Sequence, residues 1–230
     1  MDLIWDGLTE ALRLLAKGES AVYSTTARSL YVSGIATLFS LVFGVALGAF
    51  LAFQRFPGRR LALAFVNTGM GLPPVAVGLL VAIMLWRSGP LGSLGLIYTP
   101  WAMIVAQGAL AFPIITGFTA AALAAQRPEL KLQLYGLGAS RLQALCLLLK
   151  ESRLPLLAAV MAAFGAAISE VGASMMVGGN IAGETRVLTT AVVLETSKGE
   201  FAPAIALSLI LLALVFAVNL ILTLVQVRER

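Results

Sequence analysis

The sequence predicts an all-α integral membrane protein with five spans, and an amphipathic helix at residues 1–18 precedes them. Of the 230 residues, 60% are hydrophobic and 12% are charged, and the mean hydropathy is +0.96. A chain of this size and composition carries more apolar surface than one water-soluble core can bury. The apolar residues also gather in tracts long enough to cross a bilayer. We interpret residues 19–230 as a single transmembrane domain.

Charge and composition exclude several functional classes. The net charge is +5, but the basic residues are spread over short loops and form no stripe with interleaved aromatic residues, so nucleic-acid binding is not predicted. The chain has no histidine, which is the commonest general base and metal ligand. It has one cysteine, Cys146, which cannot form an intrachain disulfide. We therefore predict no catalytic residue and no metal site.

The first 18 residues predict a helix lying at the membrane interface. One side carries apolar residues and the other carries charged residues. The apolar side comprises Ile4, Trp5, Leu8, Leu12 and Leu15, and the charged side comprises Asp2, Asp6, Glu10, Arg13 and Lys17. Two early aspartates and the lack of a continuous apolar centre argue against a signal peptide.

Two spans follow, at about residues 29–53 and 61–86. Gly44 and Gly48 in the first have the spacing that lets membrane helices approach closely, and packing is the preferred explanation for them. The second follows a basic turn and is interrupted by Gly69, Gly71, Pro73, Pro74 and Gly78. Such an interruption is tolerated where protein or a water-filled cavity satisfies the freed backbone groups. It indicates either a transport pathway or a kink that only helps packing.

The remaining spans are expected at about residues 100–124, 154–176 and 202–225. Pro113 lies near the middle of the first of these three. A charged loop at about 126–153 separates the third span from the fourth. A polar segment, with a short interfacial helix at about 185–196, separates the fourth from the fifth.

Loop charges predict an outside amino terminus and an inside carboxyl terminus. Five spans place the two ends on opposite sides, and basic residues favour the inner side. The inner set would contain Arg55, Arg59, Arg60, Arg127, Lys131, Arg141, Lys150, Arg153, Arg228 and Arg230. The outer set would contain Arg13, Lys17, Arg28, Arg87, Arg186 and Lys198.

The charged loop and the polar segment carry a family resemblance. Gly138, Ala139 and Ser140, followed by Leu154 and Pro155 at the next span, resemble the coupling loop of ABC importer membrane subunits. Within that family, the runs ISEVGASMMVGGNIAGETRVLTT (168–190) and LETSKGEF (194–201) are most similar to the permease of tungstate-type importers. The resemblance covers nearly the whole chain from about residue 20. Two departures stand out: Leu132, Gln133 and Leu134 occupy the positions of the family's usual E-A-A, and Pro155 lies about one helical turn further on than usual.

The resemblance implies a type I permease core of five helices in the cell membrane, paired as a homodimer. It also implies two cytoplasmic ATPase subunits, which would bind the ATP and Mg, and an extracytoplasmic oxyanion-binding protein. The chain itself contains no G-x-x-x-x-G-K-[ST] phosphate loop, so nucleotide chemistry must come from another subunit.

The contact with the ATPase is expected at the turn in the charged loop. Glycines permit a tight bend there, and Ser140 can cap the helix that follows. The expected coupling residues are Gly136, Gly138, Ala139, Ser140 and Arg141. Without the resemblance, an ordinary amphipathic surface helix would explain this stretch.

A second group of candidate residues belongs to the pathway or its gate. Glu170 would lie roughly 24 Å along the fourth span at about 1.5 Å per residue, where an acidic group is a functional candidate. Since a carboxylate repels an anion, we expect it to pair with a basic side chain or with exposed amides. Glycine turns and hydroxyl or amide side chains can hold an oxyanion loosely. The other candidates are Pro73, Pro74, Gly178, Gly179, Asn180, Thr185 and Arg186, with Thr189 and Thr190 beside them. A glycine bend before an interfacial helix would also explain the polar members.

Other functions remain open at this point. Molybdate or sulfate is an alternative substrate, since tungstate and molybdate have nearly the same size and charge. An ion-coupled carrier would show inverted halves and paired intramembrane carboxylates, which five spans with one such residue do not match. A purely structural membrane protein would not need the interrupted second span.

Overall fold

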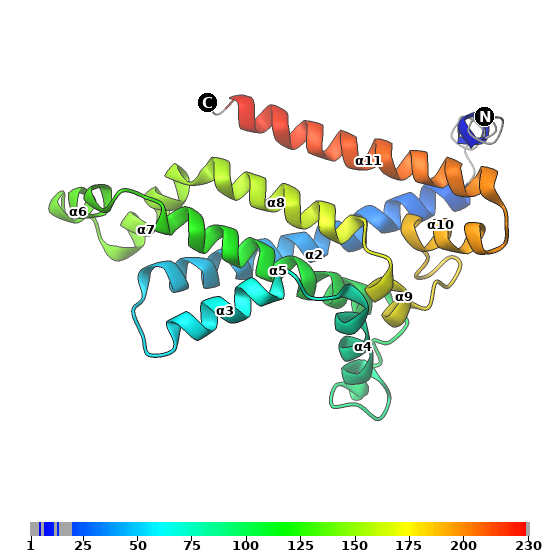
Figure 1. Cartoon of the computed structure of the whole chain (residues 1–230), viewed down its shortest axis with the longest axis horizontal. Coiled ribbons are helices and arrows are strands. Elements are labelled where there is room, and N and C mark those ends of the chain that lie inside the picture. The colour runs from blue at the N-terminus through cyan, green and yellow to red at the C-terminus, as the bar shows by residue number, and fades with distance from the viewer. Residues whose placement is uncertain (1–4, 6, 12, 14–19, 229–230) are drawn as a thin grey trace.

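The computed structural model describes residues 5, 7–11, 13 and 20–228, and every regular element in them is helical. The elements are α2 (Ser20–Phe53), α3 (Arg59–Gly69), α4 (Pro74–Leu85), η1 (Gly92–Leu94), α5 (Pro100–Ala124), α6 (Pro128–Gly136), α7 (Arg141–Glu151), α8 (Arg153–Ile168), α9 (Gly172–Gly178), α10 (Leu188–Ser197) and α11 (Phe201–Arg228). The long helices α2, α5, α8 and α11 lie side by side (Figure 1). The short helices α6 and α7 lie at one end of this bundle, and α10 lies at the other (Figure 1). The predicted all-α class is confirmed.

Three helices in the described part of the chain are long and apolar enough to cross a membrane: α2, α5 and α11. Two further candidates are bent pairs, α3 with α4 and α8 with α9, so the count reaches five if each pair is one span. The third predicted span coincides with α5, Pro113 included. The first predicted span is longer than expected, because α2 already begins at Ser20 rather than at about residue 29.

The second predicted span turns far more sharply than a kink. The axes of α3 and α4 meet at 105°, and α4 projects sideways from the bundle instead of continuing across it (Figure 1). Prolines cause the break locally: neither Pro73 nor Pro74 has a backbone N–H, and Pro74 starts α4. The inclusion of Gly78 in the interruption was wrong, because this residue lies inside α4.

Helix α5 forms the centre of the protomer and packs against α2, α3, α4, α8 and α9. Its contact with α2 depends on the two glycines predicted to pack. A Cβ atom on Gly48 would lie 2.6 Å from the carbonyl oxygen of Thr116, and one on Gly44 would lie 3.0 Å from Cγ2 of Ile115. Both glycines are buried. The packing explanation is confirmed, since any side chain would push α2 away from α5.

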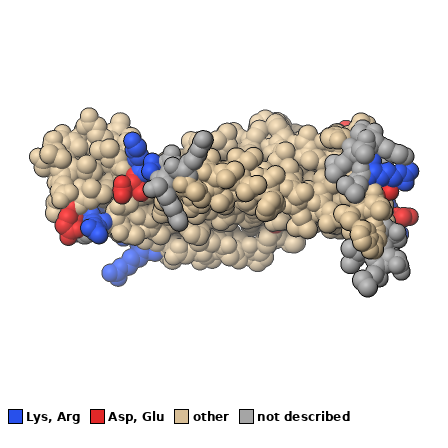
Figure 2. All heavy atoms as spheres, turned by 90° about the horizontal axis from the view of Figure 1, so that it is seen from above, with Lys and Arg blue, Asp and Glu red and all other residues tan. Residues whose placement is uncertain are grey.

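On the face shown in Figure 2, the charged side chains lie toward the two ends of the molecule, and the described surface between them is uncharged. This is the distribution expected of a bundle whose middle faces lipid. It follows from the sequence pattern, because the Lys and Arg residues lie between the apolar tracts and seldom within them.

The predicted amphipathic helix is only partly described. Residue 5, residues 7–11 and residue 13 are helical. Gly7 lies against Ile205 of α11 with no room for a side chain, and Ala11 is buried in an apolar cluster that includes Leu207 and Ile210 of the same helix. Trp5 and Leu8, from the predicted apolar side, are exposed. The other predicted members lie outside the described residues, namely Ile4, Leu12 and Leu15 on the apolar side and Asp2, Asp6 and Lys17 on the charged side.

Candidate functional site

The two helix breaks, distant in sequence, meet in space. One comprises residues 70–73 between α3 and α4, and the other comprises residues 169–171 between α8 and α9. A Cβ atom on Gly172 would lie 2.6 Å from Cγ2 of Val75, and one on Gly78 would lie 2.5 Å from Cα of Ala173. Glycines therefore let α4 and α9 touch along their backbones. The predicted residues Pro73, Pro74 and Glu170 are thus brought to one region, with both prolines exposed.

Glu170 is placed differently from the prediction. It lies in the break rather than inside a continuous span, because α8 ends at Ile168 and α9 begins at Gly172 with a 56° bend between them. Its Oε1 accepts a hydrogen bond of 2.8 Å from the backbone N–H of Ala173. Its carbonyl oxygen accepts one of 3.0 Å from Oγ1 of Thr189. The expected pairing with exposed amides is observed: a carboxylate next to a helix amino end satisfies a free N–H and faces the positive end of the dipole.

The turn after α9 is built by the predicted polar residues themselves. Gly178 ends α9, and Gly179 and Asn180 both have left-handed backbones, with φ of 69° and 53°. Oγ1 of Thr185 donates a hydrogen bond of 2.5 Å to the Gly178 carbonyl and accepts one of 2.9 Å from the N–H of Ile181. Thr185 is fully buried. Its hydroxyl is therefore committed to the turn and has no hydrogen left for an anion.

Asn180 and Arg186 stabilise the same turn through further hydrogen bonds. Nε of Arg186 donates to Oδ1 of Asn180 at 3.2 Å, and its Nη2 donates to the Asn180 carbonyl at 3.3 Å. Nδ2 of Asn180 donates to the carbonyl of Thr190 at 3.3 Å. The helix predicted at about residues 185–196 corresponds to α10, which begins slightly later, at Leu188. The predicted anion-holding groups thus form one network within the protein. Arg186 is half-buried, and in the described part of the chain some of its N–H groups have no hydrogen-bond partner.

Arg28 and Ser29 of α2 complete this network, and sequence reasoning missed them. Nη1 of Arg28 donates to the Arg186 carbonyl at 3.0 Å, and Nη2 donates to the Gly183 carbonyl at 2.6 Å. Oγ of Ser29 accepts a hydrogen bond of 2.8 Å from the N–H of Leu188. An arginine at the edge of an apolar tract looks like an ordinary loop charge, so the sequence contains no signal for its partners.

A buried polar pair joins α5 to α9 and was also missed. Nε2 of Gln107 donates to Oγ of Ser174 at 3.1 Å, while Oε1 of Gln107 has no hydrogen-bond partner among the described residues. Both side chains are almost fully buried. A signal was present here, because an amide inside an apolar span is costly unless it is paired. Gln107 therefore connects the central helix to the broken one.

The charged loop forms two short helices, α6 and α7, joined by a tight turn. Gly138 has a φ of 84°, as the predicted bend requires. Oγ of Ser140 accepts from the N–H of Gln143 at 3.3 Å, and the Ser140 N–H donates to Oε1 of Gln143 at 2.8 Å, so the predicted cap of α7 is confirmed as a reciprocal capping box. Gly136 does not contribute to the bend as predicted, because it is the last residue of α6.

Several large apolar side chains around this turn are exposed. Leu137 is 85% exposed, and Leu132 and Leu142 are about as open, at 71% and 70%. Ala139 is half-buried and Arg141 is exposed. Exposed apolar side chains gathered at one place mark a candidate contact surface. Among the described residues, no cluster of three or more His, Cys, Asp or Glu side chains could hold a metal ion.

Comparisons with known proteins agree on one family. Residues 44–230 match the family described as "binding-protein-dependent transport system inner membrane component". The chain is 40% identical over 222 residues to the tungstate uptake system permease protein TupB of Peptoclostridium acidaminophilum, covering 96% of this chain and 97% of the relative. It is 37% identical over 221 residues to TupB of Campylobacter jejuni, covering 96% and 92%.

Two further comparisons give lower identities. The molybdenum transport system permease protein ModB of Escherichia coli is 30% identical over 182 residues, covering 75% of this chain and 80% of the relative. Among solved structures, a chain of the inward-facing MetNI methionine ABC transporter has a TM-score of 0.77 at 20% identity, covering 92% of this chain and 97% of that chain. At that identity the likeness concerns the fold alone.

Proposed function

Because this chain belongs to the binding-protein-dependent transport system inner membrane components, we propose that it is the permease subunit of an ABC importer for tungstate. The observation that carries this proposal is the identity of 37–40% to two tungstate permeases over nearly the whole chain. The chain is a multi-pass membrane protein. Molybdate is the second candidate, favoured by the 30% identity to a molybdenum permease over a shorter stretch.

Uptake by the assembled importer tests the substrate. The chain would be reconstituted in liposomes with the ATPase and the binding protein of the same importer, and uptake of tungstate would be measured in competition with molybdate and sulfate. We expect tungstate to be taken up in preference to the other two. Preferred uptake of molybdate at equal concentrations would assign the chain to the second candidate, and uptake without ATP would refute the ABC importer.

Energy would enter at the turn between α6 and α7. The chain has no phosphate loop, and two separate cytoplasmic ATPase subunits would hold the ATP and Mg. Leu137 and Leu142 offer an exposed apolar contact beside Gly138, Ala139, Ser140 and Arg141. The capped start of α7 makes this contact stiff, as an element that transmits closure of the ATPases must be. Gly138→Trp should abolish copurification of the ATPase and leave the permease itself assembled.

A homodimer would cover the apolar surfaces that the protomer leaves open. Helix α4 projects from the bundle, and its residues Leu80 and Ile83 are 62% and 55% exposed. Helix α11 is largely uncovered, since only 11% of its most apolar stretch is buried in the protomer. Lipid or a second copy can cover such surfaces, and two copies would match the two ATPases of the importer. Cross-linking of a single cysteine introduced on α4 would test this contact.

We place the amino terminus outside and the carboxyl terminus in the cytoplasm. The basic turn before α3 and the α6–α7 loop lie at the same end of the bundle, toward which α11 also ends (Figure 1). The majority of the Lys and Arg residues belong to this end, which favours the cytoplasm. Labelling of a cysteine at position 141 from the outside would contradict this orientation.

The meeting of the two helix breaks would form the gate, with Pro73, Pro74 and Glu170 at the point where α4 and α9 touch. The turn at Gly178, Gly179, Asn180, Thr185 and Arg186 would support it from the outer end. Breaks of this kind allow one half of a helix to move against the other. Arg186 is the candidate for transient contact with the oxyanion, while the binding protein would supply most of the affinity.

A further inference from the structure

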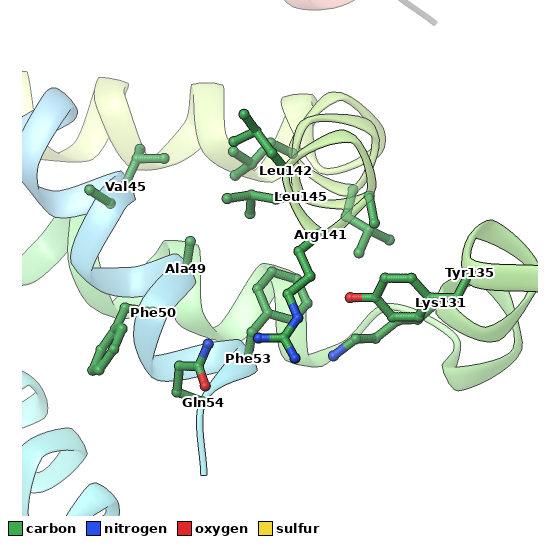
Figure 3. A pocket seen from close by; sticks show the side chains of 14 residues that line it. Val45, Ala49, Phe50, Phe53, Gln54, Lys131, Tyr135, Arg141, Leu142 and Leu145 are labelled. Carbon is green, nitrogen blue, oxygen red and sulfur yellow. The ribbon is translucent and has the colours of Figure 1, made fainter. Parts of the chain in front are cut away.

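A cavity of about 730 Å³ opens between α2 and α7, at the end of the bundle that carries α6 (Figure 3). This volume falls within the range of about 300–1,000 Å³ that is typical of ligand sites. Its long walls are apolar, with Val45, Ala46, Ala49 and Phe50 from α2 and Leu142, Leu145, Leu148 and Leu149 from α7. Arg141 and Leu142 also belong to the proposed ATPase contact, whereas the rest of the lining has no role in the functions assigned above.

The polar groups of the cavity are confined to one end. Lys131, Tyr135 and Arg141 point toward the same space beside the end of α2 (Figure 3). Nζ of Lys131 lies 4.5 Å from the centre of the Phe53 ring, which holds the ammonium group at the mouth. No acidic residue lines the cavity, and within the described part of the chain neither cation has a carboxylate in salt-bridge distance.

The shape matches a lipid that stands in one leaflet. Val45 to Phe53 is a stretch of about 12 Å at 1.5 Å per helical residue, close to the roughly 15 Å of hydrocarbon in one half of a bilayer. The cations lie where α2 leaves the apolar zone, since Gln54 and Arg55 follow directly. An apolar slot with a cationic end at this depth suits an acyl chain below an anionic headgroup.

We propose that this cavity binds an anionic phospholipid, with the phosphate at Lys131 and Arg141 and an acyl chain between α2 and α7. A free anion such as inorganic phosphate would be a poor occupant, because most of the lining offers no hydrogen-bond donor. The bound lipid would connect the last turns of α2 to the first turn of α7, directly behind the Ser140 cap. This proposal does not depend on the transported substrate.

The test is native mass spectrometry of the purified protein with phosphatidylglycerol or phosphatidylcholine added. Lys131→Gln should lower retention of phosphatidylglycerol about fivefold, the effect expected of one basic side chain at a lipid surface. Ala46→Trp, which fills the slot from α2, should lower it as well. Arg127→Gln removes a basic residue from the same loop outside the cavity and should leave retention unchanged.

Three outcomes would overturn the proposal. The first is undiminished retention in both Lys131→Gln and Ala46→Trp. The second is an equal loss in Arg127→Gln, which would indicate a general basic surface. The third is full displacement of phosphatidylglycerol by millimolar inorganic phosphate, which would indicate a free-anion site. The two test substitutions lie on separate helices, so a folding defect in one leaves the other informative.

Discussion

Oε1 of Glu170 accepts a hydrogen bond of 2.8 Å from the backbone N–H of Ala173, and this contact joins the two halves of a broken span. The carboxylate satisfies one of the free N–H groups at the start of α9. The carbonyl of the same residue binds Thr189 and so ties the break to α10. Glu170 therefore acts on the backbone of this region, and among the described residues no basic side chain lies within salt-bridge distance of it.

Substitution of Glu170 should affect the stability of the protein more than its preference among substrates. Glu170→Ala removes the cap and should lower the free energy of unfolding by about 1 kcal/mol, as loss of a helix cap typically does. Glu170→Gln keeps an acceptor oxygen and should cost less. Thermal unfolding in detergent, with uptake in liposomes, measures both effects. A large shift between tungstate and molybdate at unchanged stability would contradict this role.

The close approach of α2 and α5 predicts opposite effects at two glycines of one helix. Gly48→Ala should lower the free energy of unfolding by about 1–3 kcal/mol, because the added methyl group meets the carbonyl of Thr116. Gly34→Ala is the matched control: a Cβ atom there meets nothing within 4 Å, and alanine favours the helix by roughly 0.5–1 kcal/mol. Reversible unfolding in mixed micelles compares the pair. Equal changes in the free energy of unfolding in the two variants would show that α2 can move away from α5 without loss of stability.

The two glycines near the turn between α6 and α7 differ in backbone conformation. Gly138 has a φ of 84°, so Gly138→Ala should lose about 1–2 kcal/mol in the left-handed region. Gly136 is helical, and Gly136→Ala should be neutral or slightly stabilising. ATPase activity stimulated by the loaded binding protein should fall in the first variant only. Loss of stimulation in both at equal stability would place the coupling contact on α6.

Arg28 predicts a local effect on the turn after α9. Its guanidinium group bridges the carbonyls of Gly183 and Arg186, a geometry that the single ammonium group of lysine cannot reproduce. Arg28→Lys keeps the charge but should raise amide hydrogen exchange in residues 181–187 about tenfold, since a hydrogen bond to a charged group contributes about 1.5–3 kcal/mol. Arg13→Lys, whose arginine pairs with Glu10 at the surface, is the control. Unchanged exchange in Arg28→Lys would show that the two hydrogen bonds from Arg28 do not stabilise this turn.

Local features were predictable from the sequence because they depend on neighbours along the chain. Ser140 and Gln143 form a cap because they stand three residues apart, and Gly138 supplies a bend that only glycine adopts easily. The helix at 100–124 was predicted at its observed ends, and in the structure Thr99 caps this helix and Pro100 begins it. The break at Pro73 was also predictable from the sequence. The angle between α3 and α4 was not, because a proline removes a hydrogen bond without setting the direction of the next helix.

By itself the sequence determined the class of the protein, since apolar tracts of this length must be helices in a membrane, and its motifs indicated the family. Tertiary structure alone decided which distant groups meet. It brought the break at Pro73 to the break at Glu170, joined Arg28 to the turn at Arg186, and paired Gln107 with Ser174. These contacts depend on how helices pack against one another, and packing is set by the shapes of whole surfaces rather than by any local run of residues.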